Sequence, residues 1–221
     1  LARGDSHLWG AIQRFDRNTP PTIRWHAALA IGDALLSEAG LRDRETQRAF
    51  AALARLVRET PGDAMLRAAV ATAAHPQIAE VLRGLASDNG QPTPHSKALR
   101  GAMVDLARRA MKSRQPEAQL DLLTFASEAP ELWQQKAVLE GATGALPKGD
   151  RRTGWLVLGT TPKALVTLSQ HGDAAVRSRA QQLLGSVRVG GAAMPGAVTN
   201  LSDAEKQRVL AGGVLFRGAC A

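Results

Sequence analysis

One helix start recurs along this sequence and constrains the fold more than any other feature. In the segments 19–24, 60–67 and 171–177, a turn of small or helix-breaking residues leads to an apolar residue and then an arginine. Counted from this apolar residue, further small or apolar residues follow at positions +4, +7 and +8, which is the spacing of one face of an α-helix. The sequence therefore predicts three equivalent amphipathic helices. Their apolar sets are Ile23 with Ala27, Ala30 and Ile31, Leu66 with Val70, Ala73 and Ala74, and Val176 with Ala180, Leu183 and Leu184.

Two of the copies also carry an aspartate four residues before the arginine. Asp63 precedes Arg67, and Asp173 precedes Arg177. An aspartate at this position can accept hydrogen bonds from the free amides of the first helical turn and can pair with the arginine one turn later. We expect these four residues to hold the repeat turns together, which is a structural role.

The spacing of the copies indicates a repeat protein. A degenerate fourth copy, residues 131–139, has Trp133 at the arginine position, so the gaps between copies are 43, 66 and 44 residues. Two gaps fit the period of about 40–47 residues of two-helix armadillo or HEAT units, and we expect the long gap to hold an insertion. The pattern resembles HEAT-like repeat proteins and favours an all-α solenoid of about four helix pairs. An ordinary helical bundle is the alternative.

Composition supports closely packed helices. Hydrophobic residues make up 44% of the 221 residues, whereas aromatic residues make up 4% and tyrosine is absent. The core must therefore be built mainly from alanine, leucine and valine. No apolar run approaches the ~18 residues that a membrane-spanning helix needs. The sequence begins without methionine or a signal-like apolar block, and we expect it to be part of a longer protein.

Apolar periodicity, caps and helix breakers divide the chain into three parts. Residues 1–188 are expected to form the repeat domain, 189–199 a linker rich in glycine, alanine and proline, and 200–221 the first helix of another domain. Within the third part, Ser202 and Glu205 form a capping box. The helices predicted in the repeat domain cover 5–17, 22–38, 43–58, 63–74, 76–87, 96–113, 116–128, 131–146, a short helix opening at 160–162, and 173–188.

The last residues resemble the N-terminal helix of a class I c-type cytochrome. An amphipathic helix carries a small residue at Gly212 or Gly213 and an aromatic residue at Phe216, and it leads into Cys220 and Ala221. In that family the helix continues into Cys-x-x-Cys-His, whose two thiols form thioethers to haem and whose histidine is an axial ligand. The resemblance implies that Cys220 is the first haem c thioether, with the rest of the motif past Ala221. The alternative is a lone thiol.

Helical repeats followed by a cytochrome start resemble an arrangement in large exported bacterial proteins. These are the membrane-bound dehydrogenase-like haem-binding proteins of planctomycetes and verrucomicrobia, and residues 133–141 (Trp-Gln-Gln-Lys-Ala-Val-Leu-Glu-Gly) add to the likeness. The resemblance implies a β-propeller of the sugar-dehydrogenase or PQQ type before the repeats and a c-type haem domain after them. It implies a non-catalytic scaffold in an exported, periplasmic or cell-surface protein whose parent chain is an oxidoreductase.

No catalytic or metal-binding constellation stands out in the sequence. The histidines are scattered at positions 7, 26, 75, 95 and 171, with no pair four residues apart. Residues 149–154 lack the spacing and lysine of a phosphate-binding P-loop. The single cysteine excludes an internal disulfide framework and a multi-cysteine zinc site within this chain. We therefore expect no catalytic residues and no metal ligands here.

Positive charge supports an alternative function. The net charge is +8 and the isoelectric point is about 10.7, which favours an anionic partner such as nucleic acid. HEAT-like solenoids include alkylpurine DNA glycosylases, which this chain would then resemble. The basic residues are interleaved with Glu45, Glu59 and Asp105, as on an ordinary solvated face. The candidate residues are Arg44, Arg48, Arg55, Arg58, Arg108, Arg109, Lys112 and Arg114, with Trp9, Trp25 and Trp155.

Overall fold

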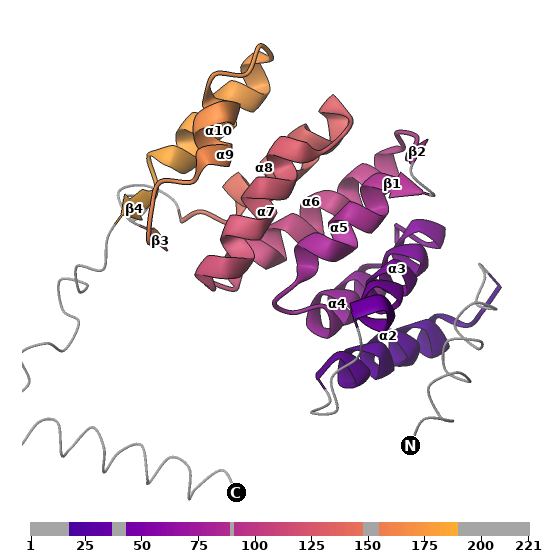
Figure 1. Ribbon diagram of the computed structural model, residues 1–221. Coiled ribbons are helices and arrows are strands. Elements are labelled where there is room, and N and C mark those ends of the chain that lie inside the picture. The colour runs from indigo at the N-terminus through magenta and orange to yellow at the C-terminus, as the bar shows by residue number, and fades with distance from the viewer. Residues whose placement is uncertain (1–17, 37–42, 89–90, 148–154, 190–221) are drawn as a thin grey trace, which may run out of the picture. The chain divides into compact units, whose positions relative to one another are not determined.

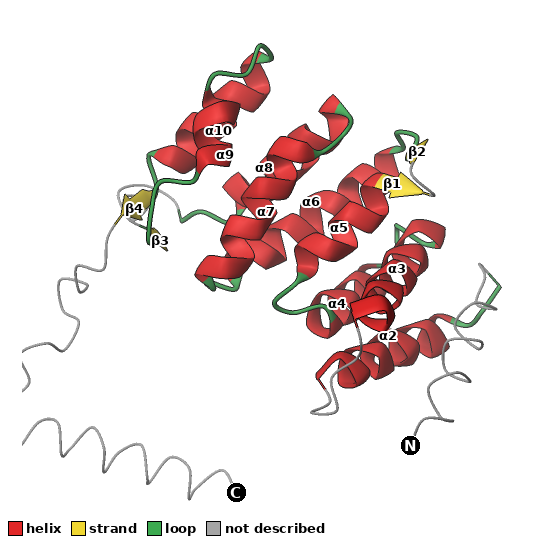
Figure 2. Ribbon diagram, in the orientation of Figure 1, coloured by secondary structure: helices red, strands yellow, loops and turns green. Residues whose placement is uncertain are grey.

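A computed structural model describes residues 18–36, 43–88, 91–147 and 155–189 (Figures 1 and 2). The chain divides into two units, Leu1–Val189 and Gly190–Ala221, and every described residue belongs to the first. Several segments discussed above lie outside the described residues: the predicted helix 5–17, residues 149–154, most of the linker, the capping box and Cys220. In the described ranges, no helix is both long and apolar enough to cross a membrane.

The described chain is mostly helical, as the apolar periodicity predicts (Figure 2). Most predicted helices agree with the structure to within two or three residues at each end. The helices are α2 (Pro21–Leu36), α3 (Asp43–Glu59), α4 (Ala64–Ala73), α5 (Ile78–Ala86), α6 (Lys97–Lys112), α7 (Pro116–Glu128), α8 (Leu132–Gly144), α9 (Lys163–Ser169) and α10 (Ala174–Leu184).

The helices pack in two rows. The even row consists of α2, α4, α6, α8 and α10, each in contact with the next even-numbered helix. The odd row consists of α3, α5, α7 and α9, which contact one another in the same way. Helices that follow one another in the chain, such as α2 and α3 or α9 and α10, join the two rows (Figure 1). Each helix therefore packs mainly against its nearest neighbours in its own row and in the chain.

Small residues bring the helices of a row close together. A Cβ atom built on Gly32 of α2 would lie 2.9 Å from the Cβ of Ala73 on α4. A Cβ atom on Gly141 of α8 would lie 2.7 Å from the Cβ of Ala107 and would overlap the carbonyl oxygen of Val104, both on α6. Because these approaches leave no room for a methyl group, the alanine- and glycine-rich composition sets the distance between neighbouring helices.

Short strands at two places were not predicted. Ser87–Asp88 (β1) pairs antiparallel with Gln91–Pro92 (β2) between the predicted helices 76–87 and 96–113, so the first of these helices ends one residue early. Leu156–Leu158 (β3) pairs in parallel with Val187–Val189 (β4). The helix predicted to reach residue 188 ends at Leu184, because the β-branched Val187 and Val189 take the extended conformation and pair with β3.

The long gap between repeat copies holds a regular helix pair, so the expected insertion there is wrong. Helix α6 begins at Ser96, whose hydroxyl oxygen accepts a hydrogen bond from the Leu99 amide at 3.1 Å. Leu99 is the apolar residue of this helix start, and the residues 4, 7 and 8 positions after it are buried. These are Met103, Leu106 and Ala107. Leu99 and Arg100 match the apolar residue and the arginine of the other copies, and Ser96 stands where two of those copies have an aspartate as the cap.

The register of the first and fourth copies also needs correction. Ile23 is 47% exposed whereas Arg24 is 5% exposed, so the buried face of α2 lies one residue later than predicted. In α8, Leu132 is 41% exposed and Gln134 is fully buried, which moves the register by two residues. Gln135, rather than Trp133, therefore occupies the arginine position.

Candidate functional site

The helix start of the repeat has one geometry in the two copies that carry an aspartate. An Asp63 carboxylate oxygen accepts from the Leu66 amide at 2.9 Å, and an Asp173 oxygen accepts from the Val176 amide at 3.2 Å. The predicted capping role of both aspartates is confirmed. Asp63 also accepts a hydrogen bond from the indole nitrogen of Trp25 on α2 at 3.0 Å, so the cap connects two helices.

The surroundings of Asp63 favour its charged form. Burial raises the pKa of Asp63, but the hydrogen bonds from Leu66, Trp25 and Met65 and the nearby charge of Arg24 outweigh burial. The pKa of Asp63 therefore lies below its ordinary value of 3.8. At neutral pH this side chain is a fixed negative charge whose hydrogen bonds hold α4 against α2.

The predicted ion pairs between each aspartate and the arginine four residues later are wrong. Arg67 instead donates to the Pro61 carbonyl oxygen at 2.7 Å, and Arg177 donates to the His171 carbonyl oxygen at 2.8 Å. Each arginine folds back over the turn because both oxygens of its aspartate are occupied: one accepts from the amides of the helix start, and the other contacts Trp25 or Lys136. Gln135 does the same in α8, donating to the Ala129 carbonyl oxygen at 3.2 Å.

Polar side chains connect each helix of the even row to the next. The residues in each pair are 37 to 40 positions apart, about one repeat. The odd row has a similar link between α5 and α7, where Arg83 donates to Asp121 at 2.8 Å. These contacts give the charged residues of the even row a structural role. The even-row pairs are Trp25 with Asp63, Arg67 with Asp105, Arg100 with Glu140, Lys136 with Asp173, and Arg179 with Glu140.

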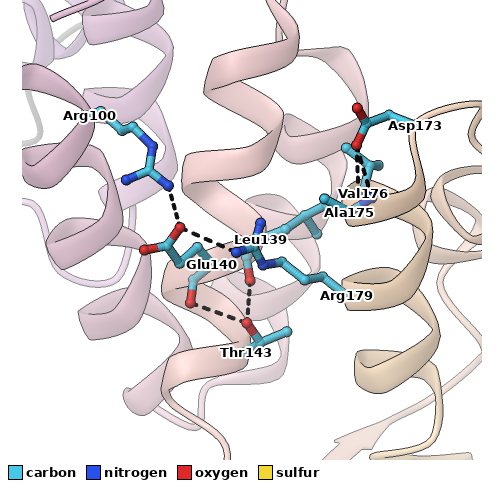
Figure 3. Close-up of polar contacts among 8 residues, drawn as sticks. All are labelled: Arg100, Leu139, Glu140, Thr143, Asp173, Ala175, Val176 and Arg179. Carbon is cyan, nitrogen blue, oxygen red and sulfur yellow. Dashed lines mark hydrogen bonds and ion pairs between the residues drawn. The ribbon is translucent and has the colours of Figure 1, made fainter. Parts of the chain in front are cut away.

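Two carboxylates of the even row, those of Glu140 and Asp105, each contact two arginines. Glu140 of α8 accepts from Arg100 of α6 and, at 3.4 Å, from Arg179 of α10 (Figure 3). Asp105 of α6 pairs with Arg67 at 3.1 Å and with Arg109 at 3.3 Å. Each group of three side chains carries a net positive charge, because one carboxylate balances only one of its two guanidinium groups.

Charge is distributed unevenly between the two rows. The even helices carry the acidic residues Asp33, Asp105 and Glu140 against a larger basic set, whereas acidic and basic residues nearly balance in the odd helices. The excess positive charge of the described helices therefore belongs to the even row. The basic residues of that row are Arg24, Arg67, Lys97, Arg100, Arg108, Arg109, Lys112, Lys136, Arg177 and Arg179.

A hollow of about 480 Å³ lies where α4 and α6 end and α5 begins. Its polar lining consists of His75, Arg109, Lys112, Thr72 and Ser113. Nothing in the sequence analysis had placed His75 beside the basic end of α6. The signal that marks this hollow is a cluster of basic residues in the last turn of a helix, which is also the ordinary position for such residues.

The histidines of the described chain do not form a cluster. His171 accepts a hydrogen bond from the Asp173 amide at 3.0 Å, a capping role. The His95 ring meets the edge of Trp133 with 5.1 Å between ring centroids. Within the described residues, no group of three or more histidine, cysteine, aspartate or glutamate side chains is placed to hold a metal ion. His7 and Cys220, the predicted first haem thioether, lie outside these residues.

The tryptophans proposed as nucleic-acid contacts have partners within the protein. Trp25 packs against the core and donates to Asp63, and Trp155 packs against the core under the guanidinium of Arg114, 5.4 Å from the ring centroid. On α3, Arg55 pairs with Glu59 at 2.8 Å and Arg58 pairs with Asp88 at 3.1 Å. Trp9 lies outside the described ranges. These tryptophans and arginines therefore have structural roles within the protein.

Comparisons with known protein families, with curated proteins and with solved structures found no match to this chain.

Proposed function

We propose that the repeat domain, residues 1–188, is a non-catalytic α-solenoid that acts as a scaffold. The observation that carries this proposal is the pattern of contacts in two rows, in which helices pack against neighbours along each row and are linked by side chains about one repeat apart. An array in which each unit contacts mainly its neighbours provides an extended frame for other domains.

The domains that this scaffold would position are a dehydrogenase-like β-propeller and a c-type haem domain. Support comes from the tail of the sequence, in which Phe216, Cys220 and Ala221 follow the pattern of a cytochrome start. Haem c would be attached through Cys220 and through a second cysteine beyond this chain. The parent protein would be an exported oxidoreductase of the periplasm or cell surface, and its repeats would supply no catalytic residues.

The test uses the natural gene product that contains this chain. It is expressed with the cytochrome c maturation machinery and purified, and its reduced-minus-oxidised spectrum is recorded before and after denaturation. Sharp c-type bands that survive denaturation, and that a Cys220→Ala variant reduces to those of a single thioether or abolishes, would support the proposal. A colourless folded product, or codons after Ala221 that do not complete Cys-x-x-Cys-His, would contradict the haem assignment. The scaffold proposal would then rest on the two-row packing of the helices alone.

Nucleic-acid binding is a second candidate, favoured by the basic excess of the even row. Phosphate contacts release counterions, so a binding constant for duplex DNA should fall steeply as salt rises from about 50 to 200 mM. Fluorescence anisotropy with a labelled duplex measures this slope. Binding that is absent at about 50 mM salt would exclude this function, because electrostatic contacts are strongest there.

A further inference from the structure

The hollow at the ends of α4 and α6 is basic in character and open to solvent, and a small ligand can enter it from the surface. Its volume of about 480 Å³ falls in the range of about 300–1,000 Å³ found for ligand pockets. His75, Arg109 and Lys112 lie on its wall beside the apolar Ile78, and none of the lining residues is acidic. A ligand in this hollow would therefore meet positive charge without a competing carboxylate in the lining.

The oxygen-bearing side chains on the wall are already occupied. The Thr72 hydroxyl donates to the Ala68 carbonyl oxygen at 3.1 Å, and the Ser113 hydroxyl donates to the Ala110 carbonyl oxygen at 2.7 Å. Because both hydroxyl hydrogens are directed at backbone carbonyl oxygens, neither hydroxyl donates to a ligand in the hollow, and each oxygen keeps lone pairs that can accept. The hydrogen-bond donors that a ligand would meet in this hollow are therefore those of the nitrogen-bearing side chains.

The cationic side chains, by contrast, have donors to spare. Arg109 uses its Nε atom on Asp105, which it shares with Arg67. Within the described residues, the terminal nitrogens of Arg109 and the ammonium of Lys112 have no hydrogen-bond or ion-pair partner. Both residues are exposed. The hollow thus presents unused donors and a net positive charge, which is the complement of an oxyanion.

We propose that this hollow binds a small organic anion bearing a phosphate group or a comparable oxyanion. The terminal nitrogens of Arg109 and the ammonium of Lys112 hold the oxyanion, His75 contributes a ring nitrogen at the edge, and Ile78 contacts the apolar body of the ligand. This assignment is independent of the scaffold function, since it concerns one site on the even row. It identifies Lys112 and Arg109 as ligand-binding residues.

Calorimetric titration of the 221-residue chain with pyrophosphate, at low ionic strength, tests the proposal. We expect one pyrophosphate per chain and a dissociation constant in the range of about 0.1–1 mM. Lys112→Gln should raise that constant about tenfold, since it removes a charge-assisted contact. Lys97→Gln is the matched control, because Lys97 is an exposed lysine at the opposite end of the same helix. It should change the constant less than about twofold.

Two results would overturn the proposal. One is the absence of binding at about 10 mM pyrophosphate, with thermal melts showing that the chain is folded. The other is equal weakening by Lys112→Gln and Lys97→Gln, which would mean diffuse attraction to net charge. A labelled DNA duplex identifies the source of the oxyanion. Competition between duplex and pyrophosphate that depends on Lys112 assigns the site to a nucleic-acid phosphate, and pyrophosphate binding without competition assigns it to a free small anion.

Discussion

At the scale of single residues, Asp63 caps α4 through the Leu66 amide and holds Trp25 of α2. Asp63→Ala should lower the free energy of unfolding by about 1–2 kcal/mol, because it removes the cap and leaves an indole donor without its partner. Urea unfolding followed by circular dichroism measures the change. Asp33→Ala is the control, since Asp33 is an exposed residue on α2 with the same charge, and it should change stability by less than about 0.5 kcal/mol. Equal losses in both variants would contradict this role.

The same carboxylate gives a prediction for pH. Because the folded-state pKa of Asp63 lies below its ordinary value of 3.8, the charged form stabilises the fold. This contribution is complete above pH 3.8 and is lost as pH falls through the lower folded-state pKa. The stability difference between wild type and Asp63→Ala should therefore be constant near neutral pH and shrink in acid. A difference that grows below about pH 4 would contradict the sign of the shift.

At the scale of elements, the approach of α8 to α6 gives a matched pair of glycine substitutions. Gly141→Ala would place a methyl group against the Val104 carbonyl oxygen and 2.7 Å from the Cβ of Ala107. It should lower the free energy of unfolding by about 1–3 kcal/mol despite the better helix propensity of alanine. Gly101→Ala lies on α6 with nothing within 4 Å of the added Cβ. It should raise the free energy of unfolding by about 0.5–1 kcal/mol.

Thermal melts of the two variants check this prediction. Opposite signs are expected because both substitutions remove the same backbone freedom and only one meets a neighbouring helix. If Gly141→Ala were as stable as Gly101→Ala, the two helices could separate without cost, and the close approach would not determine how the even row packs.

The elements show how far the sequence could predict the fold. Helix positions followed from apolar spacing and breakers, and the aspartate caps followed from local chemistry, because both depend on residues within one or two turns. The helix α6 was predicted to within one residue at each end, but it was not grouped with the repeated helix starts. The register of α8 was misplaced because Gln135, rather than Trp133, stands at the arginine position. The pairing of β3 with β4 joins segments far apart in the chain, which local patterns do not encode.

The hollow illustrates the same limit for the candidate site. Arg109 and Lys112 were visible in the sequence as a basic helix end, the ordinary position for such residues. Their place beside His75 depends on the packing of α6 against α4 and α5. Partners such as Glu140 for Arg100 are likewise about one repeat away. Sequence reasoning could name the charged residues, and only the packing shows which charges are balanced.

At the scale of the whole repeat domain, Glu140 links three helices of the even row (Figure 3). Glu140→Gln leaves the guanidinium groups of Arg100 and Arg179 facing each other without a carboxylate. We expect a loss of about 1 kcal/mol, since these side chains are partly exposed. Amide hydrogen exchange should then become about fivefold faster in α10 and α9, which are attached to the array through α8 and α7.

The helices in which amide exchange becomes faster distinguish a repeat array from a helical bundle that unfolds as one unit. In an array, stability is the sum of the repeats and their nearest-neighbour contacts, so exchange in α2 and α4 should stay at the wild-type rate. In a bundle that unfolds as one unit, the same substitution would speed exchange equally in every helix. Glu117→Gln removes the same charge from an exposed site on α7 and should leave both ends unchanged. Uniform acceleration by Glu140→Gln alone would therefore exclude the solenoid, because contacts limited to neighbours cannot transmit a local loss to α2.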